Sequence, residues 1–377
     1  MTFIRGLGEA LPSIVASLVL AVAIAYLLTP LVRRQVVRLR MVDRPSPRRV
    51  NTRPIPRGGG IAVAAAFLLV AATYSALNEA LDLVPVPAFL EAGQLVALFL
   101  GGAAAATIGA LDDYYDLRAR WQLAGQVALA LGAVALGIAI GTVQNPFGGG
   151  VFRFDGLIAG FLTVVWIVGM INSVNFVDGL DGLSTGIGII AAVTLGVLSL
   201  TTQLGQPFVA VLCFALAGAL AGFLRWNFHP ATIFAGTGGT MFLGYTLAVL
   251  AILGSAKVAV ALLVLGIPII DTFWIIVRRL AARRSPFTPD RGHLHHRLLD
   301  LGLSHRQTVV LIYLICAGLG GLSLLLSDTN QVYAFLGVLV AIGLALLVLA
   351  RGGLAGEALG ADSYENGSRP GTGAPPA

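Results

Sequence analysis

Two apolar runs enclose a polar stretch in residues 157–201, which read LIAGFLTVVWIVGMI, then NSVNFVDGLDG, then LSTGIGIIAAVTLGVLSLT. Each apolar run is close to the length of about 20 residues with which a helix crosses a bilayer. The whole chain is 57% hydrophobic and 11% charged, and its mean hydropathy is +0.89. Soluble domains carry about 25% charged residues. This composition excludes an ordinary soluble protein and predicts an all-α integral membrane protein.

Apolar runs of similar length recur along the chain and predict a polytopic bundle of about eleven transmembrane helices. They cover residues 11–32, 60–76, 93–111, 121–141, 157–173, 183–201, 207–224, 238–254, 257–277, 307–327 and 331–350. A transmembrane barrel would instead show short segments of alternating hydrophobicity. We therefore expect residues 1–351 to form a single transmembrane domain. The Gly-, Ser- and Pro-containing residues 352–377 are predicted to be a disordered cytoplasmic tail.

The arginines predict the orientation of the bundle in the membrane. Residues 33–57 contain nine arginines and residues 278–306 contain seven, whereas the loops at 77–92, 142–156 and 202–206 are acidic, neutral or very short. Basic loops stay in the cytoplasm. The sequence therefore predicts an N-terminus outside, a C-terminus inside, and a location in the inner (plasma) membrane. With this orientation the polar clusters described below all fall on the cytoplasmic side.

Acidic and amide side chains form two of these clusters. Asp112 and Asp113 directly follow an uncharged apolar run, and carboxylates at a membrane boundary suggest a functional site. The second cluster is the stretch at 172–182, with polar side chains at three-residue spacing: Asn172, Asn175, Asp178 and Asp181. Carboxylate and amide oxygens suit Mg²⁺, which takes few protein ligands and keeps water and substrate phosphates. A solvated loop or helix capping is the alternative, but capping accounts for only one of the acids.

A third cluster combines histidine with arginine. It contains Arg291, His293, His295 and His296 within the sequence RGHLHHR of residues 291–297. A zinc site is one interpretation, although no cysteine lies nearby to complete a common structural set. Guanidinium groups bind phosphate oxygens in a bidentate manner, so a diphosphate ligand fits this pattern better. Asp271, inside the run 257–277, is expected to face the bundle interior or a cytoplasmic cleft, because a lone buried acid is costly in lipid.

Four segments together resemble one enzyme family. They are DDYYD at 112–116, NSVNFVDGLDGLSTG at 172–186, NFHPATIFAG at 227–236 and SPFTPDRGHLHHRL at 285–298, and DRPSPRRVNTRPIPRGGG at 43–60 is similar too. In this order and spacing they resemble the polyprenyl-phosphate N-acetylhexosamine-1-phosphate transferases. The forms of the acidic and histidine motifs are more similar to the branch that uses a UDP-HexNAc, such as UDP-GlcNAc, than to the branch that moves phospho-MurNAc-pentapeptide.

The resemblance implies a reaction and roles for individual residues. Polyprenyl phosphate and UDP-HexNAc would give polyprenyl-diphosphate-HexNAc and UMP, the first lipid-linked step of a cell-envelope glycan. Mg²⁺ would be the cofactor, with Mn²⁺ as a substitute. Asp112, Asp113 and Asp178 would be catalytic, and Asn175, Asp178 and Asp113 would hold the metal. The implied substrate-binding residues are Asn172, Asn175, Asp181, Arg291, His293, His295 and His296. The implied partners are the two substrates and the lipid bilayer, with no nucleic acid; a homodimer is left open.

The chain departs from the family pattern at two positions. Thr237 stands where the family has an aspartate that binds the metal, and Asn51 stands where it has a histidine. Loss of a carboxylate weakens a Mg²⁺ site. A catalytically silent relative that binds UDP-sugar or lipid is therefore the first alternative. A transporter or flippase is the second; it would place its polar groups near the middle of the membrane, whereas this chain gathers them at one edge.

Overall fold

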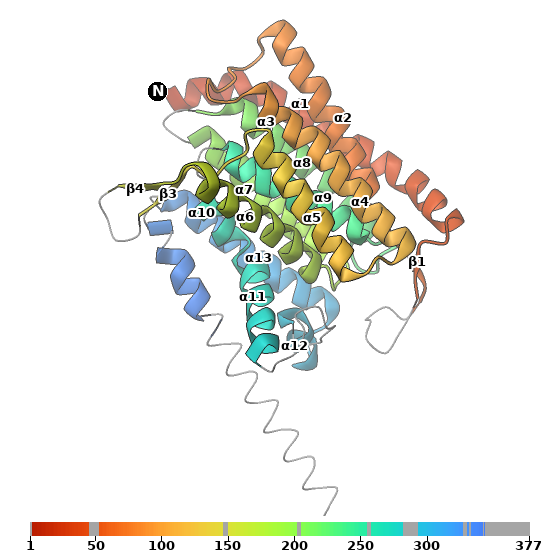
Figure 1. Cartoon of the computed structure of the whole chain (residues 1–377). Helices are drawn as coiled ribbons and strands as arrows, with labels where there is room; N and C mark the ends of the chain where they lie inside the picture. The colour runs from red at the N-terminus through yellow and green to blue at the C-terminus, as the bar shows by residue number, and fades with distance from the viewer. Residues whose placement is uncertain are drawn as a thin grey trace, which may run out of the picture.

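Helices form most of the computed structural model of the chain (Figure 1). The structure describes residues 2–44, 53–145, 150–201, 205–254, 258–281, 293–326, 330–331, 333–341 and 343. The longer helices are α1 (Thr2–Arg38), α2 (Gly60–Leu81), α4 (Gly102–Tyr115), α5 (Ala119–Ala135), α6 (Gly156–Val177), α7 (Leu183–Thr201), α8 (Pro207–Asn227), α9 (Gly236–Leu253), α11 (Gly266–Ala281) and α13 (His305–Leu325). The shorter elements are α3 (Ala92–Val96), the π-helical turn η1 (Ala97–Gly101), α10 (Val258–Val264) and α12 (Leu294–Asp300).

The prediction of an all-α polytopic membrane protein is confirmed, with fewer full-length helices than the eleven runs suggest. Among the described residues, eight helical segments are long and apolar enough to cross a membrane. The run 121–141 forms α5, which has 17 residues, and the run 257–277 is divided between α10 and α11. Residues 332, 342 and 344–350 of the run 331–350 lie outside the described residues. The division into residues 1–351 and a cytoplasmic tail stays a prediction.

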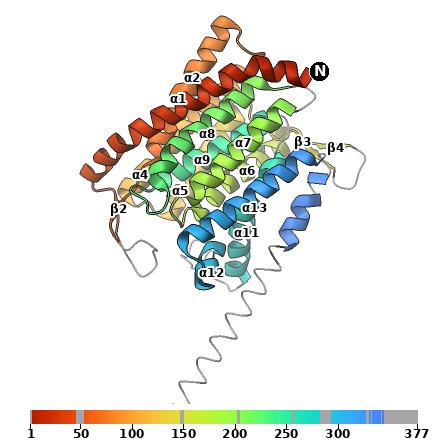
Figure 2. The ribbon, with the colours of Figure 1, turned by 180° about the vertical axis from the view of Figure 1, so that it is seen from behind.

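The centre of the bundle is formed by α8 and α9. The other helices surround them, with α1 lying along α8 on one side (Figure 2) and α4 and α6 packing on α9. The most hydrophobic windows of α8 and α9 are each 83% buried, compared with 28% for that of α1. Outer helices such as α1 and α6 expose large apolar side chains, for example Leu27 and Phe161. Such faces are expected where the solvent is lipid.

Small residues let α4 approach α9 closely near the end that carries the polar clusters. A Cβ atom on Gly109 of α4 would collide with the backbone of Thr237 and Gly238 at the start of α9. Close backbone contact through small residues is the common mode of helix association in membranes. Because Asp113 lies one helical turn beyond Gly109, this contact brings its carboxylate to the N-terminus of α9.

A short hairpin crosses the same end of the bundle. Its strands β1 (Val42–Asp43) and β2 (Ile55–Pro56) are antiparallel, with Asp43 opposite Ile55. The chain continues from β2 alongside the loop before α9. The carbonyl oxygen of Pro56 accepts a hydrogen bond from the nitrogen of Phe234, and Arg57 forms a parallel β-bridge with Phe234. The last residues before α2 are thereby fixed against the start of α9. A second hairpin, β3 (Thr142–Gln144) with β4 (Val151–Arg153), is elsewhere on the surface.

Candidate functional site

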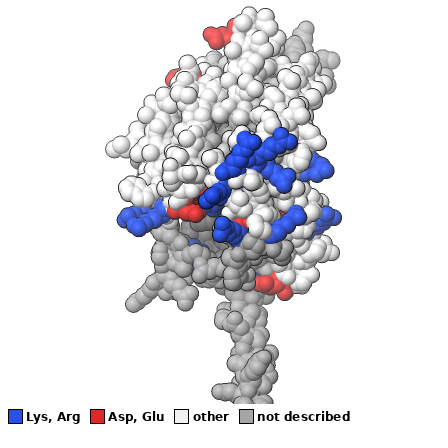
Figure 3. Space-filling view, turned by 90° about the vertical axis from the view of Figure 1, so that its right-hand side faces the viewer, with Lys and Arg blue, Asp and Glu red and all other residues white. Residues whose placement is uncertain are grey.

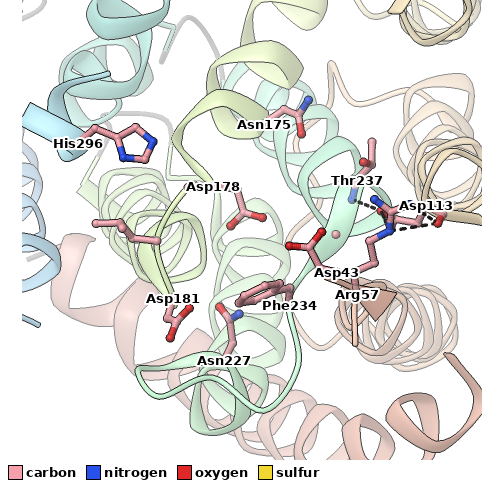
Figure 4. A pocket seen from close by; sticks show the side chains of 13 residues that line it. Asp43, Arg57, Asp113, Asn175, Asp178, Asp181, Asn227, Phe234, Thr237 and His296 are labelled. Carbon is pink, nitrogen blue, oxygen red and sulfur yellow. Dashed lines mark hydrogen bonds and ion pairs between the residues drawn. The ribbon is translucent and has the colours of Figure 1, made fainter. Parts of the chain in front are cut away.

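A pocket of about 310 Å³ opens where the hairpin, α4, α6, α8, α9 and α12 meet. Figure 4 shows its wall, in which the side chains of Asp43 and Asp178 are directed into the same space. The lining residues are Asp43, Arg57, Asp113, Asn175, Asp178, Gly179, Leu180, Asp181, Asn227, Phe234, Gly236, Thr237 and His296. These residues are spread over 254 positions of sequence, and six of them carry charge or can gain it. A polar pocket at the end of an apolar bundle is a candidate active site.

Asp113 is anchored at the N-terminus of α9. Its carboxylate accepts hydrogen bonds from the backbone nitrogens of Thr237 at 3.0 Å and Gly238 at 3.1 Å. The first N–H groups of a helix have no partners within the helix, so they attract an anion. Arg57 lies on the other side, with its Nε 3.8 Å from the Asp113 carboxylate and its Nη2 donating to the Asp113 carbonyl oxygen at 2.7 Å. Asp113 is only 2% exposed, so its position is closely fixed.

The polar stretch 172–182 contributes three side chains to the pocket. Asn175, on the last turns of α6, accepts a hydrogen bond at 3.0 Å from the hydroxyl of Thr240 on α9. Asp178 lies at the C-terminal end of α6 and accepts a hydrogen bond from the Ser184 hydroxyl. Asp181 follows in the turn between α6 and α7. One helix end followed by one turn therefore directs three of the four polar side chains of this stretch to the same cavity.

The ionisation of Asp178 is shifted by its surroundings. Its pKa is raised to about 7, mainly by burial, with a smaller contribution from the neighbouring carboxylates of Asp113 and Asp181; the hydrogen bond from the Ser184 hydroxyl acts in the opposite direction. A carboxyl group with a pKa near 7 is partly ionised at neutral pH, and its ionised form can accept a proton from a substrate. The same excess of negative charge would be relieved by a bound cation.

The predicted residues Asp112 on α4 and Asn172 on α6 lie outside the pocket lining. Asp112 accepts hydrogen bonds from the Gln122 side chain at 2.7 Å and the Leu117 nitrogen at 3.0 Å, which ties the end of α4 to α5. Asn172 donates to Gln126 of α5 at 2.6 Å. These contacts give both residues a bracing function between helices. The catalytic role of Asp112 and the substrate-binding role of Asn172 stay predictions.

The histidines of α12 take different positions. His296 lines the pocket, and His293 at the N-terminus of α12 is hydrogen-bonded to Asp271 at 2.8 Å. Asp271 is 2% exposed and also accepts from the Leu294 nitrogen at 2.9 Å, so it faces the protein interior as predicted. It anchors α12 to α11. Arg291 lies outside the described residues.

His295 is buried directly against the turn that carries the acids. A Cβ atom on Gly179 would collide with the His295 ring, and the His295 Nε2 is buried without a hydrogen-bond partner among the described residues. Burial and the neighbouring histidines hold the pKa of His295 well below its usual value, so the ring is neutral. It therefore packs α12 onto the turn rather than presenting charge to the pocket.

Four lining residues with charged, amide or aromatic side chains were not among the site residues predicted from the sequence: Asp43, Arg57, Asn227 and Phe234. Asp43 and Arg57 lie in a basic segment that is also explained by membrane orientation alone. Arg57 lies in the segment PIPRGGG and Asp43 lies two positions before Pro45, so neither shows a periodic pattern, and only the tertiary structure reveals that both line the pocket.

The donor atoms fit a Mg²⁺ ion that keeps several water and phosphate ligands. Asp43, Asp178 and Asn175 supply hard oxygen donors around the pocket, and Thr237 lines it close to Asp113. Among the described residues, the only three His or acidic side chains with ligand atoms all within 4.8 Å of one another are Asp181, His229 and His305. Asp43, Asp113 and Asp178 are therefore too far apart to surround an ion with protein ligands alone. Mg²⁺ rarely binds in such an all-protein cage and usually keeps several water ligands.

Comparison with known proteins gives consistent matches. The sequence model of "Glycosyl transferase family 4" matches residues 95–255. The chain is 35% identical to a probable undecaprenyl-phosphate N-acetylglucosaminyl 1-phosphate transferase of Bacillus subtilis, over 82% of this chain and 84% of the relative. It is 36% identical to a decaprenyl-phosphate N-acetylglucosaminephosphotransferase of Mycolicibacterium smegmatis, over 88% of both chains. It is 30% identical to an undecaprenyl-phosphate alpha-N-acetylglucosaminyl 1-phosphate transferase of Thermotoga maritima, over 72% of this chain and 78% of the relative.

Proposed function

The chain belongs to glycosyl transferase family 4, and from this we propose that it transfers GlcNAc-1-phosphate from UDP-GlcNAc to polyprenyl phosphate. The observation that supports this most directly is the meeting of Asp113, Asn175 and Asp178 in one polar pocket at the end of an apolar bundle. A lipid phosphate can reach such a pocket from the bilayer edge, and a nucleotide can reach it from water.

The reaction exchanges one phosphoanhydride bond for another. An oxygen of the lipid phosphate attacks the phosphorus that carries GlcNAc, and the bond from this phosphorus to the bridging oxygen breaks. UMP leaves with the bridging oxygen, and polyprenyl-diphosphate-GlcNAc forms. Phosphoryl transfer of this kind depends on positioning and on neutralisation of charge.

The pocket residues supply positioning and charge. Arg57 contributes a guanidinium group at one wall, where phosphate oxygens would be bound. Asp178, with its raised pKa, accepts the proton when the attacking lipid phosphate is still a monoanion. Asp113, fixed by α9, orients the reacting phosphate.

Asp178, Asn175 and Asp43 would hold Mg²⁺, with Mn²⁺ as a substitute. The ion would neutralise the diphosphate and polarise its oxygens. Thr237 contributes at most a neutral oxygen, so we expect the affinity for the ion to be modest.

The far end of the pocket suits the nucleoside. Phe234 offers the face of an aromatic ring, and Asp181 and Asn227 lie beside it with hydrogen-bonding groups. A planar base stacks on an aromatic face and is selected through hydrogen bonds to its edge. His296, on the opposite wall, is then near the diphosphate and sugar.

The distribution of basic residues supports a cytoplasmic active site in the plasma membrane. Exposed arginines lie at the pocket end of the bundle, among them Arg38, Arg118, Arg225 and Arg306. Figure 3 shows the basic side chains gathered in one region with acidic groups among them, next to a surface with few charged residues. Basic residues near membrane helices stay in the cytoplasm. The acceptor and donor would therefore meet at the inner face, at the first lipid-linked step of a cell-envelope glycan.

An extraction assay tests this function. Purified protein in detergent is incubated with Mg²⁺, polyprenyl phosphate and radiolabelled UDP-GlcNAc, and butanol-soluble label and UMP are measured. Equal amounts of both products are expected, and chelation of the metal with EDTA should remove them. Absence of product from the native chain but formation by Thr237→Asp would favour the catalytically silent relative. No product from either protein would reject the transferase function for these substrates.

A further inference from the structure

The carboxylate of Asp181 is held in place from outside the pocket. Its Oδ2 accepts one hydrogen bond from the Nδ1 of His229 at 2.7 Å and a second from the backbone nitrogen of Ala231 at 3.0 Å. In the described part of the chain, its other oxygen, Oδ1, has no hydrogen bond, and Asp181 lines the pocket beside Asn227 and Phe234. One oxygen of Asp181 is thus bound by the protein, and the other is free for a ligand.

His229 is itself supported by the first residues of α13. Its ring stacks on the ring of His305, with centroids 4.2 Å apart and planes 21° from parallel. Arg306 donates to the carbonyl oxygen of His229 at 3.2 Å. The helix start that carries both residues is stabilised by a capping box between Ser304 and Gln307. The orientation of the His229 ring is therefore set by a helix 76 positions away in the sequence.

We propose that His229 is a positioning residue for the base of the donor nucleotide, acting through Asp181, with His305 as its support. The inference rests on the proposed function, and it identifies residues that would make the enzyme prefer a uracil nucleotide as the donor. A carboxylate fixed through one oxygen presents the other as a hydrogen-bond acceptor at a defined point. Uracil has one N–H donor on its pairing edge, at N3. Cytosine carries a lone pair at N3, so the same oxygen would repel it.

A bound metal is the competing arrangement. The ligand atoms of Asp181, His229 and His305 lie within 4.8 Å of one another, and the His305 Nε2 is buried without a hydrogen-bond partner among the described residues. Such a set could bind Zn²⁺. With a metal at this site the Asp181 carboxylate would be a ligand, and the direct hydrogen bond from His229 would be lost. The metal content of the protein therefore distinguishes the two arrangements.

The first experiment compares substitutions of His229. His229→Ala removes the hydrogen bond to Asp181 and should raise the KM for UDP-GlcNAc and the Kd for UDP by about 10- to 100-fold, the range for hydrogen bonds to charged groups. The kcat and the KM for polyprenyl phosphate should change little. His229→Asn retains an N–H donor at a similar position and should restore most of the affinity. Thr232→Val, in the same loop, loses a bond to Trp226 that does not involve Asp181, so it should behave as the native chain.

The second experiment tests whether His229 acts through Asp181. In an Asp181→Ala background, His229→Ala should have no further effect on UDP affinity, because the two residues form one unit. The ratio of UDP to CDP affinity should fall in His229→Ala and in His305→Ala. Equal ratios in the native chain and in both variants would overturn the proposal. So would additive effects of the Asp181 and His229 substitutions.

UDP binding by calorimetry separates this inference from the proposed function. Native protein that binds UDP without producing lipid-linked label would reject the transferase function only. Turnover by the native chain with an unchanged KM in His229→Ala would reject the positioning role only. Stoichiometric Zn²⁺ in the purified protein that disappears in His305→Ala would overturn the hydrogen-bonded arrangement in favour of a metal site. A metal-free protein with the expected loss of UDP affinity supports it.

Discussion

The carboxylate of Asp113 accepts a hydrogen bond of 3.0 Å from the backbone nitrogen of Thr237, which lies 124 positions further along the chain. This bond joins the end of α4 to the start of α9 and fixes the pocket wall between them. Arg57 completes the arrangement from the hairpin. Three segments that are remote in sequence thus define the position of one carboxylate.

Substitution of Asp113 should remove activity without unfolding the protein. Asp113→Asn replaces an acceptor oxygen with an NH₂ group that would face the N–H groups of α9, so the side chain must turn and the wall is disturbed. We expect kcat to fall by about 100-fold or more, in the range of losses on removing one charge-stabilising group. Asp155→Asn is the matched control, because Asp155 is exposed at the other end of α6. Native activity in Asp113→Asn would contradict the proposed role.

Activity should rise with pH through the ionisation of Asp178. Its pKa is raised to about 7, so below that pH the proton acceptor is lost and kcat should fall about tenfold per pH unit. Saturating Mg²⁺ favours the charged carboxylate and should move the profile to lower pH. Asp178→Asn should leave residual activity without this acidic limb. An acidic limb that persists unchanged in the variant would show that another group titrates.

The same shift has a consequence for stability. The folded pKa of Asp178 lies above the value of the unfolded chain, so the folded state binds the proton more tightly between about pH 4 and pH 7. The contribution of Asp178 to stability is therefore present at low pH and lost as the pH rises through about 7. Without Mg²⁺, the rise in thermal midpoint from pH 7.5 to pH 5.5 should be larger for the native protein than for Asp178→Asn in the same detergent.

Thr237→Asp should strengthen the binding of Mg²⁺. The substitution adds a carboxylate to the wall that already holds Asn175 and Asp178, and hard anionic oxygens are preferred ligands of this ion. The Mg²⁺ concentration for half-maximal activity should fall by about tenfold, which corresponds to about 1.4 kcal/mol. Thr237→Asn, of similar shape but neutral, should change it much less. An equal shift in both variants would mean that charge at this position has no influence on the metal.

Gly179→Ala should disturb the packing of α12 on the acidic turn. The added methyl group would collide with the buried ring of His295, and overpacking of a buried contact costs about 1–3 kcal/mol. We expect a lower thermal midpoint and reduced turnover. Gly169→Ala is the matched control, because a Cβ atom on Gly169 of α6 meets no atom within 4 Å. A double variant, Gly179→Ala with His295→Ala, should recover part of the lost stability.

The sequence by itself determined the class of the fold, because burial in lipid requires long apolar runs and these can be counted directly. It also identified three acids and one amide of the pocket: Asp113, Asp178, Asp181 and Asn175 were all singled out by polarity at the edge of apolar runs. In such a background a polar cluster is informative without any knowledge of contacts.

Only the tertiary structure decided which of the polar residues share a cavity. Asp112 and Asp113 are adjacent in sequence, yet Asp113 faces α9 while Asp112 faces α5, because successive helical residues point about 100° apart. His229, His305 and Asp43 carry no periodic signal, and they acquire a site only through helix packing and the hairpin. Contacts across more than a hundred residues depend on the packing of small residues such as Gly109 against α9, which no local pattern encodes.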